Sequence, residues 1–137
     1  LRIMKLYCTV FFLLSAIQLS ASKVENIEVF SISMKKKVPC IVVLPDSHQN
    51  SKKRFPVVYL LHGHGANQTQ WLHDAPQLKN KADQLQQIYV CPDGGYNSWY
   101  FDSPVDPTSK YETFIARELV TFIDAKYKTL AAKSKRA

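Results

Sequence analysis

A short segment with two glycines and two histidines directly follows an apolar run near the middle of the chain. The run is Val57 to Leu61, and the segment is His62-Gly63-His64-Gly65. Glycine adopts positive φ easily and lets backbone approach a ligand closely, so Gly63 and Gly65 allow a sharp turn. Backbone N–H groups left free at such a turn can stabilise a negative charge that develops during a reaction. A plain turn without chemistry fits the same spacing equally well.

Two histidines separated by one residue could in principle bind zinc. His62 and His64 have no cysteine or acidic residue nearby at the spacing of a zinc site. We therefore expect neither a metal nor a cofactor at this turn.

The composition is that of one globular domain. The chain has 137 residues, of which 46% are hydrophobic and 21% charged, and its net charge is +7. Much of the positive charge lies in three patches: 35–37, 52–54 and 126–136. Because none of the patches has the regular alternation of aromatic and basic residues found in single-strand binders, we expect no nucleic-acid partner, and we interpret the first two patches as solvated loop charges. Binding to a nucleic acid or to an anionic surface is the alternative.

The first residues resemble a secretory signal peptide. Arg2 and Lys5 precede the apolar run Leu6 to Ile17, and small residues follow at 20–22. The run is too short to span a membrane comfortably, so no stable membrane insertion is expected. We expect a signal peptide over residues 1–22, a mature chain of 23–137 and a secreted or periplasmic protein. A buried N-terminal helix is the alternative.

Strand and helix patterns alternate along the rest of the chain. Apolar runs predict strands at 27–34, 38–44, 57–61 and 88–91, the first two forming an edge hairpin through Lys35 to Lys37. The helical spacing of Leu78, Ala82 and Leu85 predicts a helix at about 76–87 with these residues on its apolar face. A Ser109…Glu112 capping box and one apolar stripe at helical spacing predict a second helix at 110–127, and the stripe consists of Tyr111, Ile115, Leu119, Phe122 and Ile123. This order predicts an α/β fold with parallel central strands. Cys40 and Cys91 lie in strand-like runs, so we expect buried free thiols, and a disulfide is the alternative.

Five segments in this order resemble the esterase D group of α/β-hydrolases, which includes S-formylglutathione hydrolases, feruloyl and acetyl-xylan esterases and, more distantly, mycolyltransferases. The segments are Phe55-Pro-Val-Val-Tyr-Leu-Leu-His-Gly-His-Gly, Trp71-Leu72, Tyr89-Val-Cys-Pro-Asp-Gly-Gly, Asn97-Ser-Trp-Tyr-Phe-Asp-Ser-Pro104, and Tyr111-Glu-Thr-Phe followed by Glu118-Leu-Val. The resemblance runs from about Ile27 to the last residue. It implies an α/β-hydrolase fold, present here as its N-terminal half, and a serine esterase mechanism.

The resemblance also implies roles for particular residues. The backbone N–H of His64 would donate to the oxyanion, and neither His62 nor His64 would be a catalytic base. Gly63 and Gly65 would shape this loop. The pocket mouth would be lined by Trp71 and by the 97–102 loop, including Trp99, Tyr100 and Asp102. For the loop aromatics, and for Trp99 in particular, plain packing is the alternative.

In this group of esterases, the catalytic acid of the triad follows the nucleophile in sequence. Asp93 stands at a strand end, as catalytic acids do, but the order makes it a turn residue that binds backbone N–H groups.

The chain departs from the group at the catalytic triad. A serine hydrolase of this fold needs Gly-x-Ser-x-Gly, then an acid, then a histidine. No serine has glycine two residues before and two after it, and no histidine follows His73. We interpret the chain as the N-terminal portion of a secreted esterase that acts on a small-molecule or carbohydrate ester. The alternative is a non-catalytic α/β module that binds an ester or sugar through Trp71, Trp99 and Tyr100.

Overall fold

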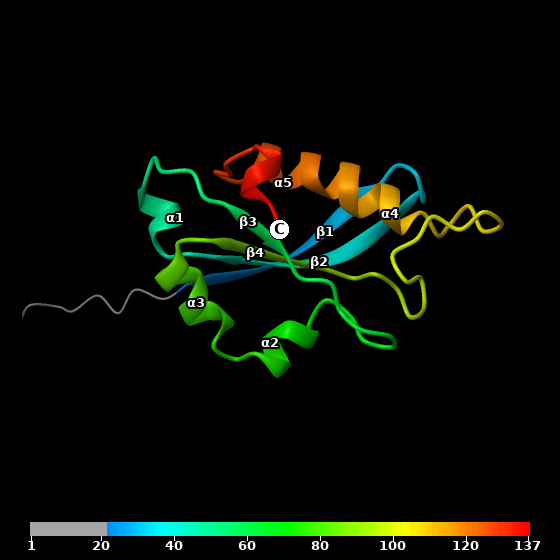
Figure 1. Ribbon diagram of the computed structural model, residues 1–137, viewed down its shortest axis with the longest axis horizontal. Coiled ribbons are helices and arrows are strands. Elements are labelled where there is room, and N and C mark those ends of the chain that lie inside the picture. The colour runs from blue at the N-terminus through cyan, green and yellow to red at the C-terminus, as the bar shows by residue number, and fades with distance from the viewer. Residues whose placement is uncertain (1–21) are drawn as a thin grey trace, which may run out of the picture.

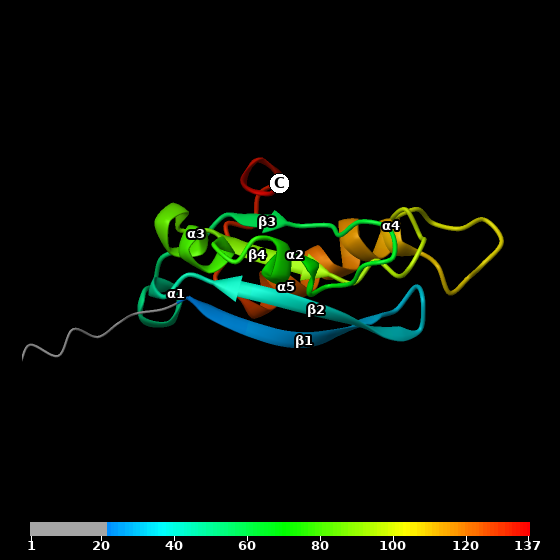
Figure 2. The ribbon, with the colours of Figure 1, turned by 90° about the horizontal axis from the view of Figure 1, so that it is seen from below.

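A four-stranded mixed sheet forms the centre of the protein. The computed structural model describes residues 22–137, so the predicted signal peptide lies almost entirely outside the described residues. The strands are β1 (Lys23–Ser31), β2 (Lys36–Leu44), β3 (Val57–Tyr59) and β4 (Ile88–Pro92), in the order β1-β2-β4-β3. Strands β3 and β4 are parallel, whereas the β1–β2 and β2–β4 pairs are antiparallel. Figure 2 shows this order from one edge to the other.

The edge hairpin forms as predicted, but with a different turn. Strand β1 starts at Lys23 and ends at Ser31, and the turn occupies 32–35 rather than 35–37. Lys35 has a φ of 55° there, a left-handed conformation that closes the turn. The lysines after it belong to β2, where Lys37 forms an ion pair with Glu28 across the hairpin. The strand β3 is shorter than predicted and ends at Tyr59.

Helices cover both faces of the sheet (Figure 1). On one face lies a continuous helix made of α4 (Tyr111–Thr113), a π-helical turn (Phe114–Leu119) and α5 (Val120–Lys126). On the other lie α2 (Gln70–Asp74) and α3 (Leu78–Leu85), while α1 (Ser47–Asn50) follows β2. A further single turn covers Lys133–Lys135. No helix within residues 22–137 has the length and hydropathy to cross a membrane.

Side chains of β2 and β4 alternate between two apolar cores, as the two-residue period of a strand requires. Val42 and Val90 face the core beneath α5, whereas Val43 and Cys91 face the core beneath α3. Cys40 lies in the first core and Cys91 in the second, so the sheet separates the two thiols and both are free. Burial raises the pKa of each thiol to about 12.

The long helix differs from its sequence prediction in two respects. The π-helical turn contains one more residue than an α-helical turn. Phe114 and Leu119, which are five residues apart, therefore both face the sheet, while Ile115 is only partly buried. The predicted Ser109…Glu112 capping box is wrong, because the N-cap is Lys110 and has no side-chain cap.

The other predicted helix is shorter than expected, covering Leu78–Leu85 and ending where Gln86 turns left-handed. Leu78 and Ala82 are buried as predicted. Leu85 is 53% exposed, contrary to its predicted place on the buried face.

The outer edge of β3 pairs with the last residues of the chain. Tyr59 N–H donates to the carbonyl of Ala137 at 2.7 Å, and Ala137 N–H donates to the carbonyl of Val57 at 3.1 Å. Arg136 forms an ion pair with Asp124 of α5 beside this edge.

Candidate active site

Two loops meet where the parallel strands β3 and β4 end. In α/β sheets, ligands bind beyond the carboxyl ends of such strands. Here the loop after β3, which contains residues 62–65, lies against the loop after β4, which contains residues 94–100. Together they enclose a pocket of about 250 Å³. The pocket is lined by His62, Gly63, His64, Gly95, Tyr96, Asn97, Ser98, Trp99 and Tyr100.

The turn after β3 uses its two glycines differently. Gly65 has a φ of 74°, which only glycine adopts without strain, and its N–H donates to the carbonyl of Tyr96 at 2.9 Å. Gly63 does not have a positive φ, so of the two glycines expected to allow the turn only Gly65 uses that conformation. The N–H of Gly63 donates to Oε1 of Gln70 at 2.9 Å, and the carbonyl of Gly63 accepts from Ala66 N–H.

The backbone N–H of His64 is a donor without an acceptor among residues 22–137, although both neighbouring glycine N–H groups are bonded. His64 lines the pocket. Its ring lies between two aromatic rings of the opposite loop, Tyr96 at 4.9 Å and Trp99 at 6.0 Å between centroids. Among the described residues, His64 therefore combines a backbone donor that has no acceptor with a place in the lining of an aromatic pocket.

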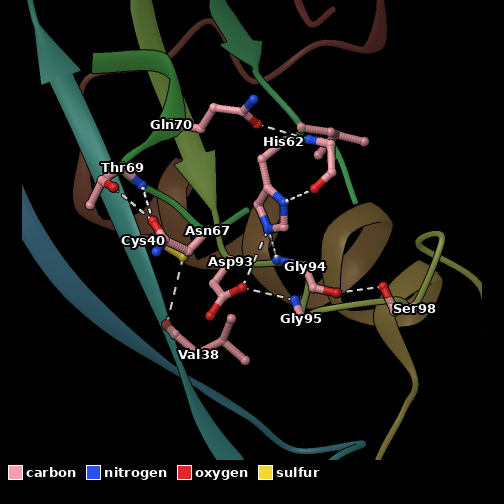
Figure 3. A network of polar contacts seen from close by, with 12 residues as sticks. Val38, Cys40, His62, Asn67, Thr69, Gln70, Asp93, Gly94, Gly95 and Ser98 are labelled. Carbon is pink, nitrogen blue, oxygen red and sulfur yellow. Dashed lines mark hydrogen bonds and ion pairs between the residues drawn. The ribbon is translucent and has the colours of Figure 1, made fainter. Parts of the chain in front are cut away.

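His62 is the most enclosed polar side chain of the site, only 2% exposed. Figure 3 shows its ring between the two loops. Nδ1 lies 2.8 Å from the carbonyl oxygen of Gly63, and Gly94 N–H donates to Nε2 at 2.7 Å. Asp93 Oδ1 is 3.3 Å from Nε2 and accepts from Gly95 N–H at 2.8 Å. The interpretation of Asp93 as a turn residue is confirmed.

The phenol of Tyr100 holds the same two loops together from the other side. Its hydroxyl accepts from His62 N–H at 2.9 Å and donates to the His62 carbonyl at 3.2 Å. Burial raises the pKa of this phenol to about 12. The ring lies directly against Gly94, where a β-carbon would come within 2.3 Å of it. Trp99 and Tyr100 both have positive φ, a strained backbone that the tight loop imposes.

The structure brings together only some of the residues predicted for the site. Trp99 lines the pocket and is 71% exposed. Trp71 lies outside the pocket lining, packs on the core beneath α3 and donates its indole N–H to the Leu61 carbonyl at 3.1 Å.

Asp102, also outside the pocket lining, binds the first turn of the long helix. Its carboxylate accepts from both the N–H of Thr113, at 3.0 Å, and the Thr113 hydroxyl, at 2.5 Å. These bonds lower the pKa of Asp102. A carboxylate at a helix N-terminus is favourable, so Asp102 provides the cap that Ser109 does not.

Sequence reasoning left His62 without a role and did not connect Tyr100 to it. A polar side chain at the end of a buried strand needs hydrogen-bond partners. This requirement could have indicated from the sequence that His62 binds other parts of the site. One partner, the Gly63 carbonyl, belongs to the next residue, but the other, the Gly94 N–H, belongs to the loop after β4, more than thirty residues later. Within residues 22–137 no three His, Cys, Asp or Glu side chains cluster in a way that would hold a metal ion.

Residues 31–137 match the family model described as "Putative esterase". The chain belongs to this esterase family. Esterase MT1326 of Mycobacterium tuberculosis (strain CDC 1551 / Oshkosh) is 35% identical over 99 residues, which are 70% of this chain and 22% of that protein. The chain thus spans about a fifth of the length of this curated relative.

Solved structures confirm the fold. A ferulic acid esterase matches with a TM-score of 0.73 and 34% identity over 86% of this chain and 47% of that one. An S-formylglutathione hydrolase from Agrobacterium tumefaciens matches with a TM-score of 0.72 and 17% identity over 86% of this chain and 48% of that one. The chain has the α/β-hydrolase fold predicted from its sequence and spans about half of these two structures.

Proposed function

We propose that this chain is the oxyanion-binding portion of a secreted serine carboxylic-ester hydrolase. The observation that carries the proposal is that His64 lines the pocket between the loops after β3 and β4 and that its backbone N–H has no acceptor among residues 22–137. Ester hydrolysis passes through a tetrahedral oxyanion, and one fixed N–H donor of this kind contributes about 3 kcal/mol to its stabilisation.

The nucleophile, acid and base of this esterase come from outside the chain. Residues 1–137 contain no Gly-x-Ser-x-Gly segment, and the relatives are longer than this chain. The oxyanion donor acts only when a nucleophile creates the oxyanion, so residues 22–137 by themselves should not turn over esters. Membership of the esterase family supports the reaction class.

We propose an ester of an aromatic acid, linked to carbohydrate, as the substrate class. The supporting observations are the name of the 34% identical structure, a ferulic acid esterase, and the aromatic lining of the pocket. His64, Tyr96 and Trp99 line the pocket and contact one another, and aromatic side chains of this kind suit contact with a planar acyl group.

The test uses the protein in which this chain is followed by its downstream coding sequence, with methyl ferulate and 4-nitrophenyl acetate as substrates. His64→Pro removes the backbone donor, whereas the matched control His64→Ala keeps it. We expect His64→Pro to lower kcat by about 10²- to 10³-fold and His64→Ala to change it far less. Thermal unfolding of both variants serves as the control for folding. Equal kcat values for the two folded variants would contradict the oxyanion role.

Export is part of the same proposal. Its support is the charged start and apolar run at Arg2 to Ile17, followed by small residues at 20–22. N-terminal sequencing of the exported protein should find a first residue near Lys23. A cytoplasmic protein that retains Leu6 to Ile17 would overturn it.

A further inference from the structure

We propose that His62 is a positioning residue that orients the peptide group between Gly63 and His64 and thereby aims the His64 N–H into the pocket. This inference rests on the proposed function, because the aim of that N–H matters only if it binds an oxyanion. One nitrogen of the imidazole has this positioning role, and the other nitrogen has a separate one.

The hydrogen bonds determine which ring nitrogen carries the proton. Gly94 N–H donates to Nε2 at 2.7 Å, so Nε2 is the unprotonated nitrogen. The carbonyl oxygen of Gly63 can only accept, and Nδ1 lies 2.8 Å from it, so Nδ1 carries the hydrogen. Asp93 Oδ1 faces Nε2 at the longer distance of 3.3 Å and already accepts from Gly95 N–H. His62 is therefore a neutral Nδ1–H imidazole.

The bond from Nδ1 controls the neighbouring donor through the geometry of the peptide. Gly63 C=O and His64 N–H belong to one peptide group, which is planar and trans, so the two bonds point in opposite directions. Nδ1–H of His62 and the N–H of Ala66 both hold the Gly63 oxygen, at 2.8 Å and 3.2 Å. A flip of this peptide would break both bonds and turn the His64 N–H away.

The bond to Nε2 has a different consequence. Gly94 belongs to the loop after β4, so its N–H fixes the ring, and with it the loop after β3, to the neighbouring strand. The ring is 2% exposed, and water therefore does not replace either bond easily. One nitrogen anchors the ring, and the other holds the peptide.

Two amide substitutions separate these bonds. In His62→Asn the shorter side chain places its NH₂ near the position of Nδ1, so it can still donate to Gly63. In His62→Gln the longer side chain places its carbonyl near Nε2, so it can still accept from Gly94. In the complete protein we expect kcat to fall about tenfold in His62→Gln, with KM changed less than twofold, and to stay within about threefold of wild type in His62→Asn.

A purely structural role predicts another pattern. The kcat values would then follow the thermal stabilities of the two variants, and the Gln variant, which keeps the link between the loops, would retain more activity than the Asn variant. That ranking would overturn the proposal.

A second measurement does not depend on turnover. In ¹H–¹⁵N spectra of the wild-type protein at neutral pH, the His62 ring should show a protonated Nδ1 and an unprotonated Nε2. Hydrogen exchange of the Gly94 amide should remain slow in His62→Gln and become faster in His62→Asn. An Nε2–H or doubly protonated ring would overturn the inference. Absence of ester hydrolysis by the wild-type protein would instead refute the proposed function. The tautomer of the ring would then still show whether Nδ1 of His62 donates to Gly63.

Discussion

Replacing Gly94 by alanine should separate the two loops of the site, because the new methyl group would occupy the place of the Tyr100 ring. The β-carbon would lie 2.3 Å from Cε1 and 2.4 Å from Cζ of Tyr100, far closer than two carbon atoms approach without bonding. Gly94 does not have a positive φ, so alanine does not strain its backbone. The whole effect should therefore come from displacement of the ring.

The contacts of the ring set the size of the effect. Tyr100 would lose two hydrogen bonds with the backbone of His62, at 2.9 and 3.2 Å, each worth about 1 kcal/mol net. It would also lose an edge contact with the imidazole at 5.8 Å, worth about 0.5 kcal/mol or more. Against this, alanine lowers the entropy of the unfolded chain, which offsets roughly 0.5 kcal/mol. The free energy of unfolding should fall by about 2 kcal/mol.

The assay is urea unfolding of four proteins: wild type, Gly94→Ala, Tyr100→Ala and the double variant. Once the tyrosine ring is absent, the alanine methyl has room, so Gly94→Ala should then cost almost nothing. The double variant should be about 2 kcal/mol more stable than the sum of the single losses predicts. Additive losses, or a Gly94→Ala protein as stable as wild type, would refute the close packing of Tyr100 on Gly94.

Two further predictions concern the glycine turn and α1. Gly65→Ala should lower the free energy of unfolding by about 1–2 kcal/mol, because its φ is 74°. The matched control Gly63→Ala has no positive φ and meets no atom closer than 3.9 Å, so urea unfolding should find it within about 0.5 kcal/mol of wild type. Burial, followed by the charge of Lys128, lowers the pKa of His48 from its ordinary 6.5, and His48 Nε2 accepts from Lys128 N–H at 3.1 Å. The unfolded chain then binds the proton more tightly, so stability should be complete above about pH 6.5 and decrease as pH falls from there through the folded-state pKa. His48→Gln should flatten this part of a plot of urea midpoint against pH, and an unchanged slope would contradict the assignment.

Local patterns were sufficient for the layers of this fold. Apolar runs of strand length and an apolar stripe at helical spacing predicted the hairpin, the strands β3 and β4 and the long helix. Their order predicted the parallel pairing of β3 with β4. Each of these features depends on residues that are close together in the sequence. Each element must also bury one apolar face, which stabilises the predicted structure.

The ends of the elements were predicted less well. The Ser109…Glu112 pattern predicted a cap, but the carboxylate of Asp102 binds the first turn instead, from a segment that forms an antiparallel β-bridge with Lys110, the residue before the helix. The π-helical turn places Phe114 in the core and leaves Ile115, which the helical spacing had predicted there, only partly buried. Packing on the sheet outweighs ideal helical spacing here.

For the candidate site, the sequence by itself determined the sharp glycine turn after β3 and the aromatic loop after β4. Only the tertiary structure decided how they fit together: Trp71 packs on a core, Tyr100 binds the backbone of His62, and the imidazole of His62 joins the loops. The physical reason is that a buried polar group must find its partner wherever the fold places one. For His62 that partner is Gly94, which the pairing of two parallel strands brings beside it.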